Sequence, residues 1–347
     1  MGIWLSDITM MVRDTAHVYD RSSAADLLAR IGVPAGAQAI PTSAARFPDG
    51  GAWRVEIPSV ESVAALRAGL DGARELGLTI HRVSQGSGVM LLLDSEIGEL
   101  VTICAESGIE LCLFLGPRAA WDIGGGRASI SGSGGVRARG ADQLRQCVAD
   151  AQRAAELGVR CLLVGDEGVL WVLHELRSAG HLPEDLRLKI SGLSGPLNPA
   201  SFALLERLGA DSVNVHSDLT LAQLAELRAA AAAAIDLYVE APDDLGGFVR
   251  HHDASEFVRV AAPVYLKFGL RNAPPLYPAG AHLAPVLEAT TRERVRRAAL
   301  CLQLMARSGN VLPASPPGAC APPRGMRRLD PGQLFTTDEA GGTEGTG

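Results

Sequence analysis

The sequence predicts a (β/α)8 TIM barrel, an eight-stranded parallel α/β barrel, over residues 52–307. Two observations lead to this fold class. Eight short apolar runs end in polar or charged residues, and Ala-, Leu- and Arg-rich stretches of helical composition follow them. Strands that alternate with helices pair in parallel through right-handed crossovers, and eight such units over about 250 residues is the usual size of this barrel. An open doubly wound sheet is the second candidate.

The expected strands are short and lie at similar intervals. In order along the chain they span residues 53–59, 79–86, 111–118, 160–167, 187–191, 212–218, 235–241 and 264–271. Polar residues recur at every second position in five of them. These are Arg54 and Glu56, Arg187 and Lys189, Asn214 and His216, Asp236, Tyr238 and Glu240, and Tyr265 and Lys267.

This alternation predicts where the polar side chains point. Successive side chains of a strand face opposite sides of the sheet. The outer face of a barrel must be apolar to receive the helices, so we expect the polar set to point into the lumen, which Val, Ile and Leu usually fill. Buried charges cost on the order of several kcal/mol unless they are paired, hydrated or bound to a ligand. The pattern therefore favours a functional lumen, with a structural ion-pair network as the alternative.

Extensions are expected at both ends of the barrel. Residues 1–51 form an N-terminal extension, with a capped helix at 22–32, that could cover the bottom of the barrel. Residues 308–347 are rich in Pro, Gly and Thr, which predicts a disordered tail. Between the third and fourth strands, the Gly-rich stretch 121–135 predicts a mobile lid, and a backbone nest for an anion is the alternative.

Composition argues against several classes of protein. With 47% hydrophobic residues among 347, the chain can build one large core. No apolar run reaches the roughly 20 residues of a membrane helix, and the N-terminus lacks the order of a signal peptide, so we expect a cytoplasmic protein. A net charge of −7 without a basic stripe argues against duplex nucleic acid as a partner. Six cysteines without a C-x-x-C pair predict buried thiols.

In a barrel of this kind the chemistry lies at the C-terminal ends of the strands. Glu240 and His216 lie on neighbouring strands with the same predicted parity, so we expect them to exchange protons with the substrate. Together with Glu56 or Asp166 they could instead bind a divalent metal, which is the alternative interpretation.

The lysines and arginines of the polar set predict an anionic ligand. Lys189 and Lys267 are expected to stabilise developing negative charge, with a Schiff-base nucleophile as the second interpretation. Guanidinium groups suit a carboxylate or a phosphate. The residues expected to bind the substrate are Glu56, Arg54, Arg82, Arg118, Asn214, Arg271 and His282.

Two segments, 208–224 and 235–241, resemble the collagenase-like peptidase family U32. A Leu-Gly-Ala motif at 208–210 leads into a strand, a Leu-Thr-Leu motif at 219–221 begins a helix, and the next strand follows. The resemblance implies a barrel fold and a peptidase-like hydrolase. Glu240 and Ala241 stand where the family has His and Gly, and no cysteine follows nearby. The chain thus resembles a divergent member without the Cys-rich signature, and the iron–sulfur cluster of some relatives is not expected.

The sequence therefore predicts an enzyme that acts by acid–base chemistry on an anionic small molecule or peptide, a hydrolase by resemblance. A lyase or aldolase, a metal-dependent barrel enzyme and a non-catalytic ligand-binding barrel are the alternatives. Barrels of this type often pair through their helices, so a homo-oligomer is compatible with the prediction.

Overall fold

The computed structural model describes residues 27, 30, 40–117, 133–309 and 311–319. Its described elements belong to the second of two units into which the chain divides, Ile40–Gly347. Arg118, nearly all of the predicted helix 22–32 and most of the Gly-rich stretch 121–135 lie outside the described residues.

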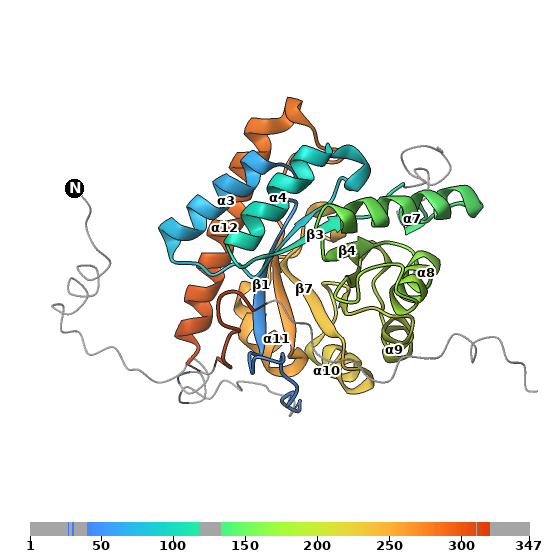
Figure 1. Ribbon diagram of the computed structural model, residues 1–347. Helices are drawn as coiled ribbons and strands as arrows, with labels where there is room; N and C mark the ends of the chain where they lie inside the picture. Colours follow the sequence, from blue (N-terminus) through green and yellow to red (C-terminus); the bar gives the residue numbers. More distant parts are fainter. Residues whose placement is uncertain (1–26, 28–29, 31–39, 118–132, 310, 320–347) are drawn as a thin grey trace, which may run out of the picture. The chain divides into compact units, whose positions relative to one another are not determined.

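Eight parallel strands close into a barrel, each hydrogen-bonded to the next and the last to the first (Figure 1). The strands are β1 (Trp53–Pro58), β2 (Arg82–Gln85), β3 (Glu110–Phe114), β4 (Cys161–Val164), β5 (Arg187–Ile190), β6 (Ser212–Asn214), β7 (Ala234–Glu240) and β8 (Val264–Phe268). The predicted TIM barrel is confirmed, and the open sheet is wrong because β1 pairs with β8.

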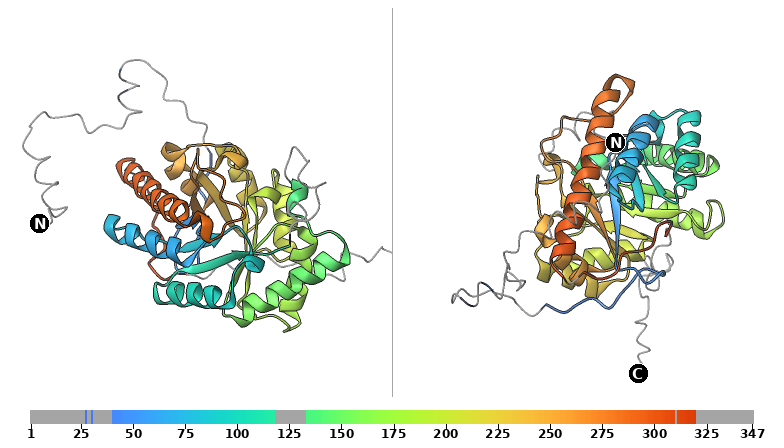
Figure 2. Two further views of the ribbon diagram at one scale, coloured as in Figure 1. Left: turned by 90° about the horizontal axis from the view of Figure 1, so that it is seen from above. Right: turned by 90° about the vertical axis from the view of Figure 1, so that its left-hand side faces the viewer.

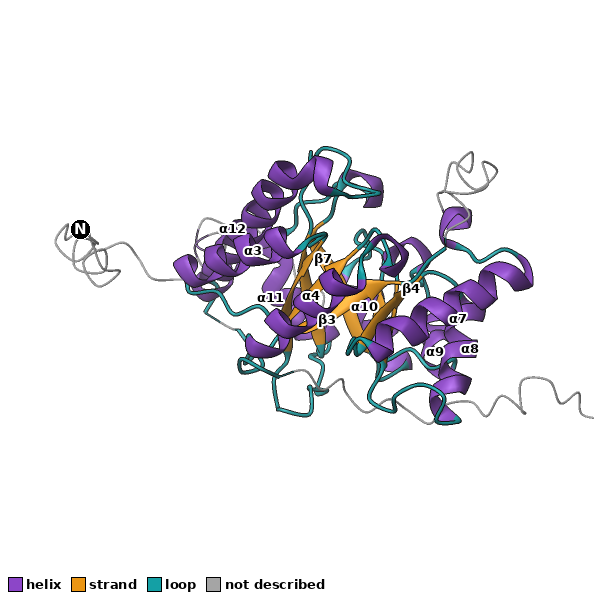
Figure 3. Cartoon of the chain, turned by 45° about the horizontal axis from the view of Figure 1, so that its top comes forward, coloured by secondary structure: helices purple, strands orange, loops and turns teal. Residues whose placement is uncertain are grey.

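Helices surround the strands (Figures 2 and 3). They are α3 (Val63–Leu76), α4 (Asp94–Glu106), α7 (Gly140–Glu156), α8 (Glu167–Ser178), α9 (Pro199–Arg207), α10 (Leu221–Ala230), α11 (Ala254–Ala261) and α12 (Ala284–Arg307). Short 3-10 turns lie between several strands and helices: η1 (Val89–Leu91), η2 (Ser133–Val136), η3 (Gly192–Ser194), η4 (Asp243–Leu245), η5 (His251–Asp253) and η6 (Ala281–Leu283). None of the helices in the described ranges is long and apolar enough to cross a lipid bilayer.

Local sequence signals set the ends of these helices. Helix α3 begins at Ser62, whose hydroxyl accepts a hydrogen bond from the backbone N–H of Ala65, and it ends at Gly77 in the left-handed conformation. Helices α3 and α12 approach closely, because a side chain on Gly69 would place its Cβ 2.9 Å from Thr291 Cγ2. The outer layer therefore closes between its first and last helices.

Two segments that flank the barrel in sequence pack against its N-terminal end. The backbone N–H of Ala52 donates to the carbonyl of Pro313, and Trp53 Nε1 donates to the carbonyl of Leu312, both over short distances of 2.7 and 2.8 Å. Arg54 donates to Ser315 Oγ over 3.0 Å and to Asp49 Oδ2 over 2.7 Å. Residues 40–51 thus lie at the bottom of the barrel, and the fold continues past residue 307 into 311–319, which the sequence placed in the tail.

The five cysteines of the described ranges are free and buried, which confirms the buried-thiol interpretation for these positions. Cys112 on β3 and Cys161 on β4 are paired in register, and they form an apolar cluster with Phe114, Val136 and Leu163. One side of the lumen is therefore apolar.

A buried ion-pair network fills the rest of the lumen. Arg82 on β2 pairs with Glu110 on β3, with Asp236 on β7 at 2.8 Å and with Glu56 on β1 at 3.2 Å. Lys189 on β5 pairs with Glu56 and lies 3.8 Å from Asp236. Burial would raise the pKa of the Glu56 carboxyl, but the neighbouring cations outweigh burial and hold this pKa well below its ordinary value of 4.5.

We expect Glu56→Gln to lower the free energy of unfolding by about 3–5 kcal/mol, because it leaves buried cations without their carboxylate. Urea denaturation followed by circular dichroism would measure the loss. Glu99→Gln is the matched control, since the Arg67–Glu99 pair lies on the surface and should contribute little. Equal losses in the two variants would show that the lumen network does not hold the barrel.

The same pKa shift predicts how stability depends on pH. Because folding lowers the pKa of Glu56, its contribution is fully present above about pH 4.5, the ordinary value, and is lost as the pH falls toward the folded-state pKa. In Glu56→Gln the acid-induced drop in melting temperature should be smaller than in the unmodified protein. A drop of the same size would contradict the shift.

Candidate functional site

A cavity of about 450 Å³ opens at the C-terminal ends of the strands. Residues at or just beyond the ends of the strands line it, among them Ser59, Gly86, Phe114, Asn214, Pro242 and Leu270. The segments 40–51 and 311–319 pack at the opposite end of the barrel. Barrels of this class have their active sites at the C-terminal end, where the cavity lies.

Lys267 on β8 lies at the inner end of this cavity and is 2% exposed. Its ammonium donates a hydrogen bond to Asn214 Oδ1, lies 3.4 Å from Glu56 Oε1 and sits 4.3 Å from the centre of the Tyr238 ring. These contacts fix the head of the side chain between three strands. An ammonium has three N–H donors, so the group can still serve a ligand while it holds Asn214.

The sequence contains only two lysines, and both lie in the lumen. Lys189 pairs with Glu56 below the cavity and is not among the residues that line it. The structure therefore gives the two lysines different surroundings. Lys267 faces the cavity, and Lys189 is enclosed in the ion-pair network.

Arg294 also lines the cavity, although it comes from helix α12 rather than from a strand end. It is 2% exposed and sits on the buried face of that helix with Thr291, Val295 and Ala298. The sequence analysis missed it because only strand ends were considered. The available signal was an arginine at a core position of an amphipathic helix, since such positions rarely hold an unpaired charge.

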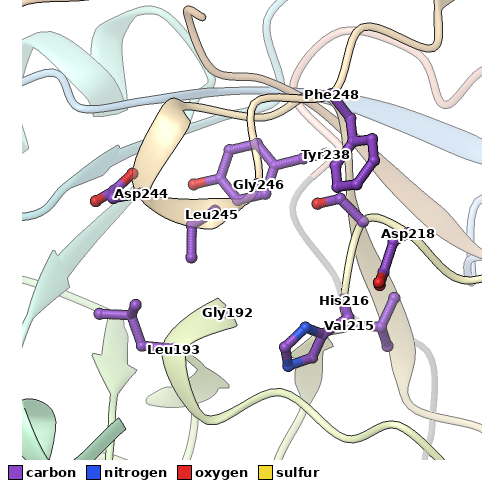
Figure 4. A pocket seen from close by; sticks show the side chains of 11 residues that line it. Gly192, Leu193, Val215, His216, Asp218, Tyr238, Asp244, Leu245, Gly246 and Phe248 are labelled. Carbon is purple, nitrogen blue, oxygen red and sulfur yellow. The ribbon is translucent and has the colours of Figure 1, made fainter. Parts of the chain in front are cut away.

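A second cavity of about 260 Å³ adjoins the first and shares its walls at Gly192, Leu193, Tyr238, Asp244 and Leu245. Figure 4 shows His216 and Asp218 on one side of this smaller cavity and Tyr238 with Asp244 on the other. His216 is exposed at the end of β6. The two cavities thus bring an imidazole and a carboxyl group to the edge of the space that Lys267 faces.

Two groups shared by the cavities have shifted pKa values. Burial and the like charge of Asp243 raise the pKa of the Asp244 carboxyl above its ordinary value. Burial, aided by the Glu56 carboxylate, raises the pKa of the Tyr238 hydroxyl as well. Asp244 is thereby a carboxyl that takes up a proton more readily than an ordinary aspartate does.

Glu240 does not join this site, contrary to the expected alternation. A bulge in β7 pairs Tyr238 with Lys267 but Glu240 with Phe268, so Val239 is an extra residue. Because one inserted residue reverses the facing of those that follow, Glu240 points away from the lumen. Its carboxylate lies 3.2 Å from His251 Nε2 and accepts a hydrogen bond from the backbone N–H of Arg271.

The predicted pair of Glu240 and His216 is therefore not brought together. Burial would raise the pKa of Glu240, but the contact with His251 and the hydrogen bond from the backbone N–H of Arg271 outweigh burial and lower this pKa. Arg297 on α12 adds a positive charge 3.6 Å from the carboxylate. Glu240 is a paired carboxylate in the wall between the barrel and its helices.

The predicted substrate-binding residues divide into three groups. Arg54, Arg82 and Glu56 are enclosed below the cavity, where their partners are other residues of the protein. Asn214 lines the larger cavity. Arg271 is 60% exposed at the rim, 3.7 Å from Asp243, and His282 is exposed in η6.

The rim carries a residue in an unusual backbone conformation. Ser59 has a φ of 60°, which costs free energy for a residue other than glycine and often marks a functional site. Its hydroxyl is hydrogen-bonded to that of Tyr277 in the loop after β8. A side chain on Gly86 would place its Cβ 2.5 Å from the Tyr277 ring, so glycine is needed there for this packing.

No group of three or more His, Cys, Asp or Glu side chains in the described ranges is arranged to hold a metal ion. Glu56, Asp166, His216 and Glu240, the residues considered for a metal, lie in separate surroundings. Glu56 is in the lumen network, Asp166 caps helix α8, His216 is in the smaller cavity and Glu240 is behind the wall.

Comparison with known proteins finds solved structures of similar fold but no matching sequence. No protein-family model and no curated protein sequence matches the chain. An aldolase from Escherichia coli K12 is 15% identical with a TM-score of 0.43, over 74% of this chain and 93% of the aldolase. A U32 peptidase is 17% identical with a TM-score of 0.39, over 69% and 100%. Orotidine 5'-monophosphate decarboxylase from Methanocaldococcus jannaschii is 10% identical with a TM-score of 0.41, over 72% and 98%. These likenesses concern the fold alone.

We expect Glu240→Gln to lower stability rather than to change ligand binding, because the carboxylate serves His251 and Arg297 and not the cavity. The loss should be about 1–3 kcal/mol, the cost of leaving a buried charged partner unsatisfied. Thermal unfolding with and without a ligand of the cavity would measure both effects. Glu293→Gln is the control, since Glu293 also pairs with Arg297 but at the surface. Loss of ligand binding with unchanged stability would show that Glu240 takes part in ligand binding after all.

Proposed function

We propose that this protein is an enzyme that transforms a small organic anion by acid–base chemistry in the cavity at the barrel mouth. The observation that carries the proposal is the position of Lys267. It is a buried ammonium at the inner end of a cavity of about 450 Å³, on the C-terminal side of the barrel. Such a group is suited to stabilise negative charge that develops on a substrate.

The charge of the lumen favours an anionic ligand. Three carboxylates, Glu56, Glu110 and Asp236, share their contacts with four cations, Arg82, Arg187, Lys189 and Lys267. The network therefore carries a positive surplus, and Lys267 is its member at the cavity. In a site that excludes much of the water, such a surplus attracts an anion more strongly than it would at the surface.

The walls favour a ligand that has an organic part. Phe114 and Leu163 form one side of the cavity, and Leu270 and Leu276 form another. Burial of apolar surface supplies affinity, and a small number of polar groups fix the orientation of the ligand. An inorganic anion alone would leave most of this space unused.

Proton transfer is assigned to the residues of the adjoining cavity. Asp244 lines both cavities, and His216 lies across the smaller one (Figure 4). Histidine and carboxyl side chains are common general acids and bases in enzymes. In hydrolysis, which the sequence resemblance implies, His216 would take a proton from the attacking water and Lys267 would stabilise the oxyanion that forms. Asp244 would give a proton to the leaving group as its bond to the carbonyl carbon breaks.

A lyase or aldolase is the second candidate, because Lys267 is a buried amine that faces the cavity. A base such as His216 would first take a proton from the Lys267 ammonium. The free Nζ would then attack a ligand carbonyl, and loss of water would give an imine. Borohydride reduces such an imine to a stable secondary amine. Mass spectrometry of protein treated with pyruvate and sodium borohydride would find the adduct on the peptide that contains Lys267. An unmodified peptide would favour the charge-stabilising role.

The two lysines allow a direct test of binding. Protein labelled with ¹⁵N-lysine should give one backbone amide signal from Lys189 and one from Lys267, which single Lys→Met variants assign. Small carboxylates and phosphate esters that enter the cavity should shift the Lys267 signal more than that of Lys189. Failure of every such anion to shift it would refute the proposed site.

Turnover of each bound anion would then be followed by proton NMR. We expect Lys267→Met to lower the rate by about 100-fold or more, the usual effect of removing a group that stabilises transition-state charge. Arg296→Met on the exposed face of α12 is the control. Binding without turnover of any ligand would favour the non-catalytic barrel.

The pKa of Asp244 provides a test that needs no substrate. Since Asp243 contributes to the raised pKa, Asp243→Asn should lower the midpoint at which the Asp244 carboxyl titrates. Carbon-13 NMR of aspartate-labelled protein would follow the carboxyl signal, which Asp244→Asn assigns. An unchanged titration midpoint would show that Asp243 does not contribute to the raised pKa of Asp244.

A further inference from the structure

Arg294 differs from the other buried arginines in the described part of the chain. Arg54 pairs with Asp49, Arg82 with three carboxylates, and Arg177 with Asp211. Arg228 donates to the backbone carbonyls of Ala231 and Ala233. Each of these guanidinium groups has an acceptor that carries a full or a strong partial negative charge.

Arg294 has only a weak acceptor. Its Nη1 donates to Thr290 Oγ1 over 3.3 Å, and its Nε has no hydrogen-bond partner among the described residues. Glu61 and Glu240 are near enough to act on its charge but form no ion pair with it among the contacts of the described chain. Burial lowers the pKa of this guanidinium, which reflects the unfavourable placement of its charge.

Folding alone does not explain such a group. A buried cation without a counter-ion destabilises a protein, and a methionine of similar length would fill the same space without this cost. Arg294 lines the cavity together with Ser59 and Tyr277, so an anionic ligand in that space could reach its guanidinium. A planar guanidinium is well matched to a carboxylate or a phosphate.

Lys267 lines the same cavity but is held differently. Its ammonium is engaged by Asn214 and Glu56, whereas Arg294 comes from the outer helix α12 and forms no hydrogen bond or ion pair with either residue. The cavity thus presents two separate cations. One belongs to the lumen network, and the other forms no ion pair with a residue of the described ranges.

We infer that the ligand of this cavity carries two anionic groups joined by an organic part, one of which binds Arg294 while the other lies at Lys267. Dicarboxylates and phosphate-bearing carboxylates are the two chemical classes that meet this requirement. The inference rests on the proposed function and adds the class of its substrate.

The test compares ligands that differ in one anionic group. Glutarate and pentanoate have the same chain length, and 3-phosphoglycerate represents the phosphate-bearing acids. Titrations of ¹⁵N-lysine protein, read at the Lys267 amide, would give each dissociation constant. We expect glutarate or 3-phosphoglycerate to bind about tenfold or more tightly than pentanoate, because the second group gains a charge-assisted hydrogen bond. Which of the two binds more tightly distinguishes the classes.

Arg294→Met should remove this preference, because the second anionic group then has no cation to bind. It should also raise the melting temperature, or at least not lower it, because an unpaired buried charge is removed. Arg296→Met on the exposed face of the same helix should change neither quantity. A fall in melting temperature together with a retained preference would show that Arg294 serves folding and would overturn the inference.

The remaining outcomes separate the inference from the function on which it rests. If pentanoate binds as tightly as glutarate and 3-phosphoglycerate, the inference of a ligand with two anionic groups is wrong, but the proposed anion-binding site at Lys267 is retained. If none of the three shifts the Lys267 signal, both are wrong.

Discussion

The pairing of Glu56 with its surrounding cations is the interaction on which the rest of this barrel depends. Its carboxylate joins β1 to Lys189 on β5, to Lys267 on β8 and to Arg82 on β2, across a lumen that other barrels fill with apolar side chains. A network of this kind is stable only when nearly every member is paired. It therefore fixes the side chains that reach the mouth, and Lys267 takes its position from it.

The two ends of the barrel differ because the chain closes only one of them. At the N-terminal end, Arg54 is held by Asp49 and Ser315, and the segments 40–51 and 311–319 occupy the opening. At the C-terminal end, the loops after the strands leave two adjoining cavities. Lys267 thus brings the charge of the network to a cavity at the C-terminal end, which gives the proposed site its direction.

The β7 bulge decides which residues form that site. It turns Glu240 toward His251 and Arg297, and the chain that follows carries Asp244 over the cavity. As a result, Glu240 is a paired carboxylate in the wall, and Asp244 is a carboxyl with a raised pKa at the mouth. The acid–base role expected for Glu240 therefore passes, in the proposed mechanism, to Asp244 and His216.

The sequence by itself determined the barrel, because eight alternations of strand and helix and the polar residues at every second strand position follow from local periodicity. It also indicated Asn214 and Lys267, which pair in register with Asp236 and Tyr238, the part of β7 that precedes the bulge, and so keep the expected parity. Only the tertiary structure decided the roles of Glu240 and Arg294. A one-residue bulge has no distinctive sequence signal, and Arg294 reaches the cavity from a helix far along the chain, so both placements arise from packing between distant segments.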